Sequence, residues 1–338
     1  MKDFMSVKNV EDTFQLSAMQ QGMLLDRFSC FVIGTESHVI RCAEILLQRG
    51  HQIYGIISSE TRIRDWAKEK GIPPIEPGPD LTSVLSRQPF DYLFSIVYPH
   101  IIPSEILALP RKAAINFHDG PLPRYAGMNA TSWALINREA THGVTWHVMS
   151  AGVDEGDILK QHSVDIVEDD TALTLNAKCY EAAIDAFAEL ADELANGSVE
   201  IRKQNLAERT YFAKYRRPPA ACTLSWSQTA DEIAALVRAL DFGPYTNPLG
   251  LPKLVMGGEV FIVPEIKALG ASSRSVSGTI SAIDHDSLRV VTANNEVALH
   301  RLLTINGQPL SVADFAARFG VQEGDKMYLP PASRVNIW

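Results

Sequence analysis

Three polar side chains in the middle of the chain could together catalyse attack on a carbonyl carbon. Asn116 and His118 lie two positions apart at the end of a predicted strand, and Asp154 follows 36 positions after His118 in the turn-forming stretch AGVDEGD. An amide and an imidazole can donate hydrogen bonds to the oxyanion of a tetrahedral intermediate, and a carboxylate can accept the proton that an attacking nucleophile loses. The alternative is that these residues only satisfy backbone groups in turns.

Short apolar runs that alternate with amphipathic stretches predict the scaffold for these residues. Strands are predicted at 28–34, 52–58, 91–97 and 112–117, and helices at 39–49 and 61–70. This alternation is typical of β-α-β crossovers and of a mostly parallel sheet. Open sheets of this kind bind ligands beyond the carboxyl ends of their strands, which is where Asn116 and His118 fall.

The remaining pattern predicts a second, smaller domain. The runs 143–149 and 158–166 alternate as an antiparallel edge would, and a long helix runs from Asp170 as N-cap to Gly197 over one face of the sheet. A proline-containing connector at 216–221 precedes a helix capped by Thr229 and Glu232. Short β-rich runs then follow at 259–263, 278–283, 288–292 and 296–301. We therefore expect an α/β, Rossmann-like catalytic domain at 28–216 and a small OB-like β-barrel domain at 217–338, after an N-terminal arm at 1–27.

Composition narrows the classes of function. The 338 residues carry 31 Lys and Arg against 40 Asp and Glu, a formal net charge of −9 that gives no long-range attraction to nucleic acid. No apolar run reaches the ~18 residues of a membrane span, and the N-terminus has no signal-peptide pattern. The four cysteines form no C-x-x-C pair, so we expect buried thiols and no metal. These features predict a cytoplasmic protein with neither a nucleic-acid nor a membrane partner.

Two stretches around the three polar residues resemble a known family. They read INFHDGPLPRYAG at 115–127 and GVDEGD at 152–157. Both resemble the folate-dependent formyltransferases, including the methionyl-tRNA enzymes, in which an N-x-H…SLLPxYRG loop and a later D-x-G-D turn frame the site. The likeness covers nearly everything after Phe28, including the C-terminal run from LSWSQTADEI to SVADFAARFG.

The resemblance implies an enzyme, a formyl donor and a set of site residues. Asn116 and His118 would hold the oxyanion, Asp154 would accept the amine proton, and 10-formyltetrahydrofolate would be the one-carbon donor, with no metal. The pterin would lie between the segment 98–102 and the loop 149–154. The residues expected to contact it are Tyr98, His100, Ile101, Ile102, Leu122, Met149, Gly152 and Val153. We expect a structural role for His147 and none for Arg62 or Arg124.

Two departures from the methionyl-tRNA enzymes bear on the formyl acceptor. The long basic loop that those enzymes carry after the second strand is replaced by SSETRIRDWAKEKG at 58–71, and the main basic cluster left is Arg216-Arg217. The stretch FQLSAMQQGML at 14–24 resembles the start of condensation domains in nonribosomal peptide synthetases, although in isolation it could be an amphipathic arm. The sequence PLPRYAGMNATSWAL at 121–135 also resembles the formylation domains of such synthetases.

These departures favour an initiation module that formylates an amino acid held on a peptidyl carrier protein by phosphopantetheine, with an adenylation domain in the same assembly line. The runner-up is a sugar-nucleotide N-formyltransferase acting on a UDP- or dTDP-amino sugar. A hydroxyornithine formyltransferase and a methionyl-tRNA formyltransferase follow. A docking module that keeps the formyltransferase fold without activity is the non-enzymatic alternative.

Overall fold

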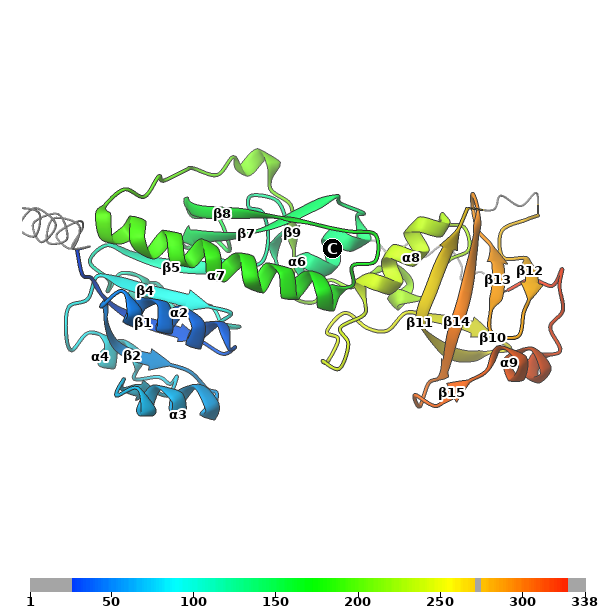
Figure 1. Cartoon of the computed structure of the whole chain (residues 1–338), viewed down its shortest axis with the longest axis horizontal. Helices are drawn as coiled ribbons and strands as arrows, with labels where there is room; N and C mark the ends of the chain where they lie inside the picture. The colour runs from blue at the N-terminus through cyan, green and yellow to red at the C-terminus, as the bar shows by residue number, and fades with distance from the viewer. Residues whose placement is uncertain (1–25, 271–274, 328–338) are drawn as a thin grey trace, which may run out of the picture. The chain divides into compact units, whose positions relative to one another are not determined.

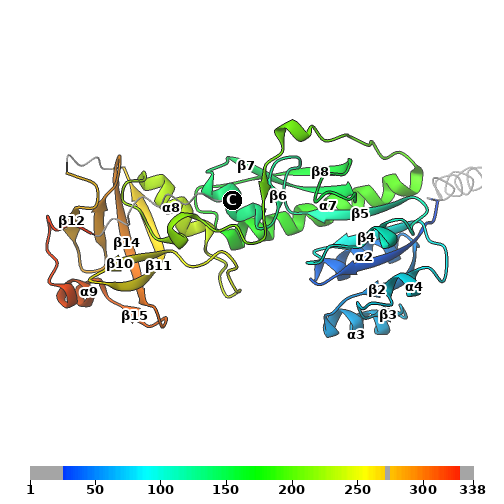
Figure 2. The same cartoon turned by 180° about the vertical axis from the view of Figure 1, so that it is seen from behind.

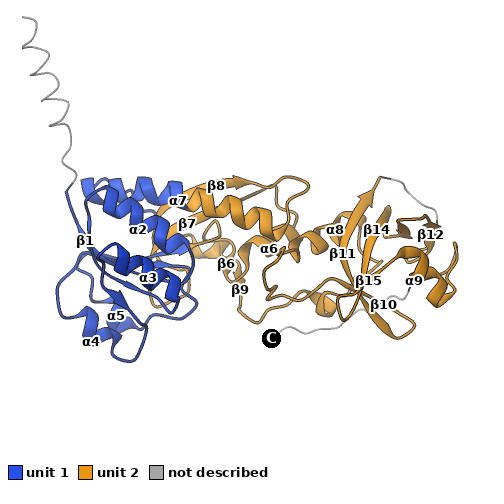
Figure 3. Ribbon diagram, turned by 60° about the horizontal axis from the view of Figure 1, so that its bottom comes forward, with its two compact units in different colours: residues 1–117, 184–202 blue, residues 118–183, 203–338 orange. Residues whose placement is uncertain are grey.

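The computed structural model describes residues 26–270 and 275–327, and the chain divides into two compact units (Figure 3). Unit 1 comprises residues 1–117 and 184–202, and unit 2 comprises residues 118–183 and 203–338. The predicted N-terminal arm, with its condensation-domain resemblance at 14–24, lies outside the described residues apart from its last two positions. The predicted domain boundary after residue 216 stays a prediction.

Unit 1 is built on parallel strands, as the apolar runs predict. Their order is β3-β2-β1-β4-β5, and β1 pairs in parallel with both β2 and β4. Every residue of β1 is buried, which explains why its sequence is apolar without alternation. The strands span Ser29–Gly34 (β1), Gln52–Ile57 (β2), Pro74–Ile75 (β3), Tyr92–Ile96 (β4) and Ala113–His118 (β5).

Helices cover the strands of unit 1 (Figure 1). The longest helix, α7, packs Phe187 edge-on against Phe94 of β4 at 5.2 Å, which confirms that this helix covers the sheet. Its first turn differs from the prediction, because α7 begins at Ala172 and the hydroxyl of Thr171 accepts from the Thr174 N–H at 3.3 Å. Asp170 instead binds Thr174 and Lys178 through its side chain. The helices are α2 (His38–Gln48), α3 (Thr61–Glu69), α4 (Leu81–Leu85), α5 (Ser104–Leu107) and α7 (Ala172–Asn196).

Unit 2 begins with the antiparallel pair that the alternating runs predict. Strands β7 (Thr141–Val148) and β8 (Ile158–Asp165) pair from Thr141 opposite Asp165 to His147 opposite Ile158. Two short strands, β6 (Ala126–Gly127) and β9 (Tyr211–Phe212), pair in parallel and join segments 85 positions apart. Helix α6 (Ala130–Ile136) follows β6 and is almost wholly buried.

An antiparallel sheet forms the C-terminal part of unit 2, with α8 and α9 packed against it (Figure 2). Its order is β10-β11-β14-β13-β12, with β15 paired to β14. The sequence predicts most of it but misses β10 and the full length of β11, where register shifts bend the strand. The elements are α8 (Ala230–Ala239), β10 (Lys253–Met256), β11 (Glu259–Leu269), β12 (Ile280–Ile283), β13 (Leu288–Val291), β14 (Glu296–Thr304), β15 (Pro309–Leu310) and α9 (Val312–Phe319).

The observed fold therefore confirms the predicted class, a mostly parallel Rossmann-like sheet followed by an antiparallel half-barrel. The capping box of α8 forms as the sequence predicts, with Thr229 and Glu232 bonded reciprocally. All four cysteines are buried free thiols, also as predicted. Among the helices of the described residues, none is both long enough and apolar enough for a membrane crossing.

Candidate active site

His118 ends β5 and is held by the loop that follows it. Its Nε2 lies 2.8 Å from the carbonyl oxygen of Tyr125, and its Nδ1 lies 3.6 Å from Asp154 Oδ2 and 3.7 Å from Asp119 Oδ1. A carbonyl can only accept, so Nε2 carries a proton and donates it.

The Nδ1 of His118, on a side chain that is 5% exposed, has no hydrogen bond of ordinary length and is open in that sense. Both carboxylate oxygens lie beyond the 2.7–3.2 Å range of an N–H···O hydrogen bond. An N–H held near carboxylates but not bonded to them can donate to a new oxygen without first breaking a strong bond. This arrangement suits a developing oxyanion.

Asp154 lies in the turn between β7 and β8 and is held as an ionised carboxylate. Its Oδ2 accepts from the Gly127 N–H at 2.8 Å, and its Oδ1 lies 3.5 Å from His147 Nε2. Burial alone would raise the pKa of Asp154, but His118, His147 and the Gly127 N–H together hold it well below its ordinary value. The residue adopts φ 55°, a left-handed conformation that persists only where surrounding contacts impose it.

The loop after His118 has little freedom to rearrange. A Cβ at Gly120 would lie 2.6 Å from His118 Nε2, so only glycine allows the ring its contact with Tyr125. Gly127 has φ +97° and a Cβ there would lie 2.2 Å from the Phe212 carbonyl oxygen. Thr145 of β7 donates to the Gly120 carbonyl and accepts from the Leu122 N–H. These contacts fix the backbone that presents His118 and the Gly127 N–H.

A segment distant in sequence supports the Asp154 turn. The amide of Gln204 donates to the carbonyl oxygens of Asp154 and Gly156 at 2.9 and 2.6 Å, and Arg209 donates to that of Val153 at 2.9 Å. Sequence reasoning did not identify Gln204 or Arg209. Only their contacts in the fold distinguish them, because a single glutamine or arginine in a polar segment carries no local signal.

Asn116 lies two residues before His118 on β5, as predicted, opposite Ser95 of β4. Its side-chain amide donates to the carbonyl of Phe117 at 2.9 Å, and the residue is half-buried. His147, which the sequence predicts to be structural, is buried and contacts the Asp154 carboxylate. The structure therefore places the imidazoles of His118 and His147 beside the two oxygens of the Asp154 carboxylate.

The residues predicted to contact the pterin differ in exposure. In unit 1 the rings of Tyr98 and His100 meet edge-on at 5.3 Å, Ile101 is 86% exposed and Ile102 is buried. In unit 2 Leu122 is buried with Ala126 and Ile158, whereas Val153 is 43% exposed and Met149 and Gly152 are partly exposed. Ile101 and Val153 each leave apolar surface uncovered within their own unit. The pterin contacts stay a prediction.

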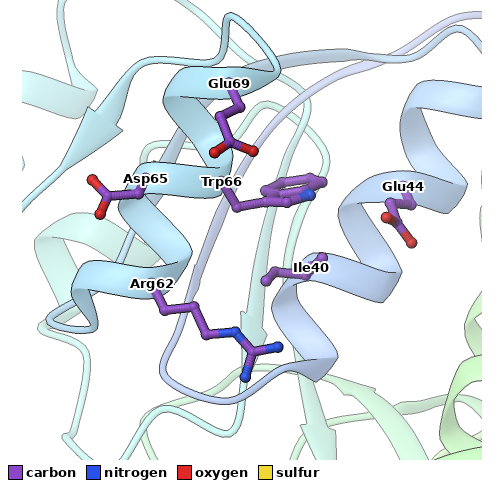
Figure 4. Close-up of a pocket in the computed structure, with 6 residues that line it drawn as sticks. All are labelled: Ile40, Glu44, Arg62, Asp65, Trp66 and Glu69. Carbon is purple, nitrogen blue, oxygen red and sulfur yellow. The ribbon is translucent and has the colours of Figure 1, made fainter.

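A hollow between α2 and α3 of unit 1 contains none of these residues (Figure 4). Three of its six lining side chains are carboxylates, one is an arginine and one is a tryptophan. The lining residues are Ile40, Glu44, Arg62, Asp65, Trp66 and Glu69. Across residues 26–270 and 275–327, no group of three or more His, Cys, Asp or Glu side chains is arranged to hold a metal ion.

Comparison with known proteins identifies the relatives of the chain. The family model described as formyl transferase matches residues 63–190, and the model of its C-terminal domain matches residues 218–320. The chain is 24% identical over 309 residues to the methionyl-tRNA formyltransferase of Alkaliphilus oremlandii, covering 87% of this chain and 97% of the relative. The corresponding enzyme of Legionella pneumophila is 26% identical over 298 residues, covering 83% and 92%.

Solved structures share the fold at lower identity. An N-formyltransferase from Helicobacter canadensis, in complex with folinic acid and dTDP-3-aminofucose, matches with a TM-score of 0.63 at 17% identity, covering 81% of this chain and 99% of that one. WlaRD, a sugar 3N-formyl transferase, matches with a TM-score of 0.64 at 18% identity, covering 84% and 99%.

Proposed function

The chain belongs to the formyl transferase family and is a folate-dependent N-formyltransferase, and we propose that His118 and Asp154 carry its chemistry on a primary amine. The observation that supports this assignment is the open Nδ1 of His118, aimed at a carboxylate that stays ionised at neutral pH. Such a pair can stabilise negative charge on oxygen and positive charge on nitrogen within one site.

The donor, 10-formyltetrahydrofolate, supplies an electrophilic formyl carbon when it is bound. An uncharged amine attacks that carbon, and its nitrogen becomes cationic while the formyl oxygen becomes anionic. His118 donates through Nδ1 to the oxygen, and Asn116 donates from its amide. Asp154 attracts the ammonium and accepts its proton directly or through water, after which the bond between the formyl carbon and N10 of the donor would break and N10 of the released tetrahydrofolate would take up a proton. A carboxylate with so low a pKa is a weak base, so the electrostatic contribution of Asp154 exceeds its contribution as a base.

The molecule that carries the acceptor amine has to be argued separately from the reaction. The names of the relatives support an amino-sugar nucleotide or methionyl-tRNA. The connection between β2 and α3 is only residues 58–60, which leaves no room for a long basic loop, and the net charge of −9 opposes binding of tRNA. An amino-sugar nucleotide is therefore the first candidate acceptor.

An aminoacyl group tethered to a peptidyl carrier protein is the second candidate. It is favoured by the resemblance of residues 14–24 to the start of a condensation domain and by the resemblance of residues 121–135 to the formylation domains of nonribosomal peptide synthetases. Under this reading an adenylation domain in the same assembly line loads the carrier.

Mass spectrometry can test the reaction and the acceptor together. The enzyme is incubated with 10-formyltetrahydrofolate and separate panels of dTDP- and UDP-amino sugars, aminoacyl carrier proteins, hydroxyornithine and methionyl-tRNA. A gain of one formyl group in one panel is expected, and its absence in the matching Asp154→Asn reaction assigns the transfer to this site. If no amine gains a formyl group although folate binds, the proposed catalysis is wrong and the docking-module alternative holds.

A further inference from the structure

Residues 203–217, which we call the basic strip, concentrate positive charge in an acidic chain. They hold five cationic side chains and one carboxylate, whereas the whole chain has a formal net charge of −9. Within the described parts of the chain, no carboxylate oxygen lies within 4.0 Å of the side-chain nitrogens of Lys203, Lys214, Arg216 or Arg217. By contrast, Arg124 of the same unit is paired with Glu139. The basic strip therefore offers four cations without a carboxylate partner.

Aromatic rings hold several of these cations in place. The guanidinium of Arg216 lies 4.8 Å from the centre of the Phe212 ring and 5.0 Å from that of Trp133. Lys214 lies 5.9 Å from the centre of the Tyr215 ring. A cation placed over a ring loses less freedom when it binds an anion, because its position is already restricted.

Exposed apolar side chains lie among the cations. Tyr215 is 80% exposed, Leu206 48% and Tyr211 43%. Met128 and Val153, which are 42% and 43% exposed, belong to segments that the basic strip hydrogen-bonds directly. Tyrosine, arginine and methionine beside open apolar surface are typical of protein interfaces, where lysine and glutamate are depleted.

The basic strip is also fixed to the catalytic turn. The Gln204 amide binds the main chain of Asp154 and Gly156, and Arg209 binds that of Val153. The Phe212 carbonyl accepts from the Met128 N–H at 2.8 Å, beside the Gly127 N–H that holds Asp154. A partner seated on the strip would therefore bring its own groups next to the turn that carries Asp154.

From these observations, and resting on the second candidate acceptor of the proposed function, an aminoacyl group on a carrier protein, we propose that the basic strip docks the acidic face of the carrier protein domain that presents this acceptor. The cations without a carboxylate partner complement its charge, and the exposed tyrosines supply apolar contact. A polynucleotide fits less well, because the rest of the acidic chain would repel its phosphates. Methionyl-tRNA is accordingly an outcome that the test must separate.

Charge reversal on the basic strip tests the proposal by direct binding. The variant Lys214→Glu/Arg217→Glu is compared with Lys70→Glu/Arg87→Glu, which reverses two exposed cations of unit 1. The probe is a purified acidic peptidyl carrier domain bearing phosphopantetheine, labelled for fluorescence anisotropy at about 0.1 M salt. We expect the strip variant to raise Kd by at least about 10-fold and the control variant to leave it unchanged. Far-ultraviolet circular dichroism and thermal unfolding check that both variants fold.

Three results would overturn the docking proposal. These are no binding of the carrier by the wild-type chain, equal binding by the strip variant, or an equal loss in the control variant. Preferential binding of methionyl-tRNA that disappears in the strip variant would assign the strip to RNA instead. Formyl transfer by the wild-type enzyme to a protein-free aminoacyl pantetheine is measured separately. Failure of that transfer counts against the aminoacyl acceptor of the proposed function, whereas carrier binding decides the docking surface.

Discussion

Buried histidines in the two units meet opposite surroundings. In unit 1, His38 stacks on Phe117 at 5.6 Å and His51 stacks on Phe28 at 3.6 Å. Burial lowers the pKa of each to about 4, with the Arg49 charge adding to the effect at His51. In unit 2, His118 is about as buried as His51, whereas His38 is half-buried, and His118 faces carboxylates. The same residue type is thus a neutral packing group in one unit and a hydrogen-bond donor poised for catalysis in the other.

This comparison indicates that the groups facing a buried imidazole, and not burial alone, distinguish a candidate catalytic histidine from a packing histidine. At His38 and His51 burial is the largest cause of the lowered pKa, so the neutral ring is favoured. At His118 two carboxylate oxygens lie within 3.7 Å of Nδ1. The variants that follow alter either the surroundings of His118 and Asp154 or the packed histidines of unit 1.

The largest expected effect comes from removing the charge of Asp154. The variant Asp154→Asn keeps the shape of the side chain but removes the charge that attracts the ammonium and one of the two carboxylates that face His118, so we expect kcat to fall by about 10³-fold. Steady-state formyl transfer measures this, with the exposed Asp169→Asn as the control. A variant that keeps more than about a tenth of wild-type kcat would remove Asp154 from the chemistry.

A smaller but still severe effect is expected from Gly127→Ala. The new Cβ would lie 2.2 Å from the Phe212 carbonyl in a residue with φ +97°, so the N–H that holds Asp154 must move. We expect kcat to fall by about 10²-fold together with a loss of stability of about 1–3 kcal/mol. Gly307→Ala has a similar φ of +78° with nothing within 4 Å and serves as the control. Equal kcat losses in the two variants would show that backbone strain alone is responsible.

The neutral histidines of unit 1 predict how stability depends on pH. Their folded pKa of about 4 lies below the unfolded value of ~6.5, so the unfolded chain binds more protons between these limits. Their contribution is complete above pH ~6.5 and is lost as the pH falls towards 4. Urea unfolding at pH 7 and pH 5 should show this decrease, and His51→Asn should reduce it. An unchanged decrease in the variant would mean that other groups titrate instead.

A modest effect is expected from Gln204→Ala, which removes two hydrogen bonds to the main chain around Asp154. At about 1 kcal/mol for each bond, we expect kcat to fall by about 30-fold while KM for the donor stays unchanged. The exposed Gln308→Ala is the control. A change in KM alone would place Gln204 in substrate binding and not in positioning.

The sequence predicted the fold better than it predicted the support around the site. The strands of unit 1 and the cap of α8 follow from local patterns, because apolar runs and a Thr229 to Glu232 spacing act within a few residues. The N-cap of α7 was misplaced by one residue because Asp170 and Thr171 are both good caps, and the contacts of Asp170 with Lys178 decided between them. The role of Gln204 could not be read locally, since its partners lie about 50 positions away.

At the candidate active site, too, the sequence predicted the residues but not the contacts that position them. Spacing placed Asn116 and His118 on one strand and Asp154 in a later turn, and the resemblance implied that the three form one catalytic trio. Neither showed that Nε2 of His118 is occupied by Tyr125 and that Nδ1 remains open, because this depends on a turn that Gly120 alone permits. His147 was predicted to be structural, and its contact with Asp154 depends on the β7–β8 turn bringing the two together.

A double-mutant cycle in single-turnover formyl transfer tests the central claim most directly, namely that His118 and Asp154 act as one unit. His118→Asn, Asp154→Asn and the double variant are compared at saturating donor and acceptor. We predict that the double variant is about as slow as the slower single variant, because either change alone disables the pair. Losses that multiply would contradict the account, since they would show two residues working independently.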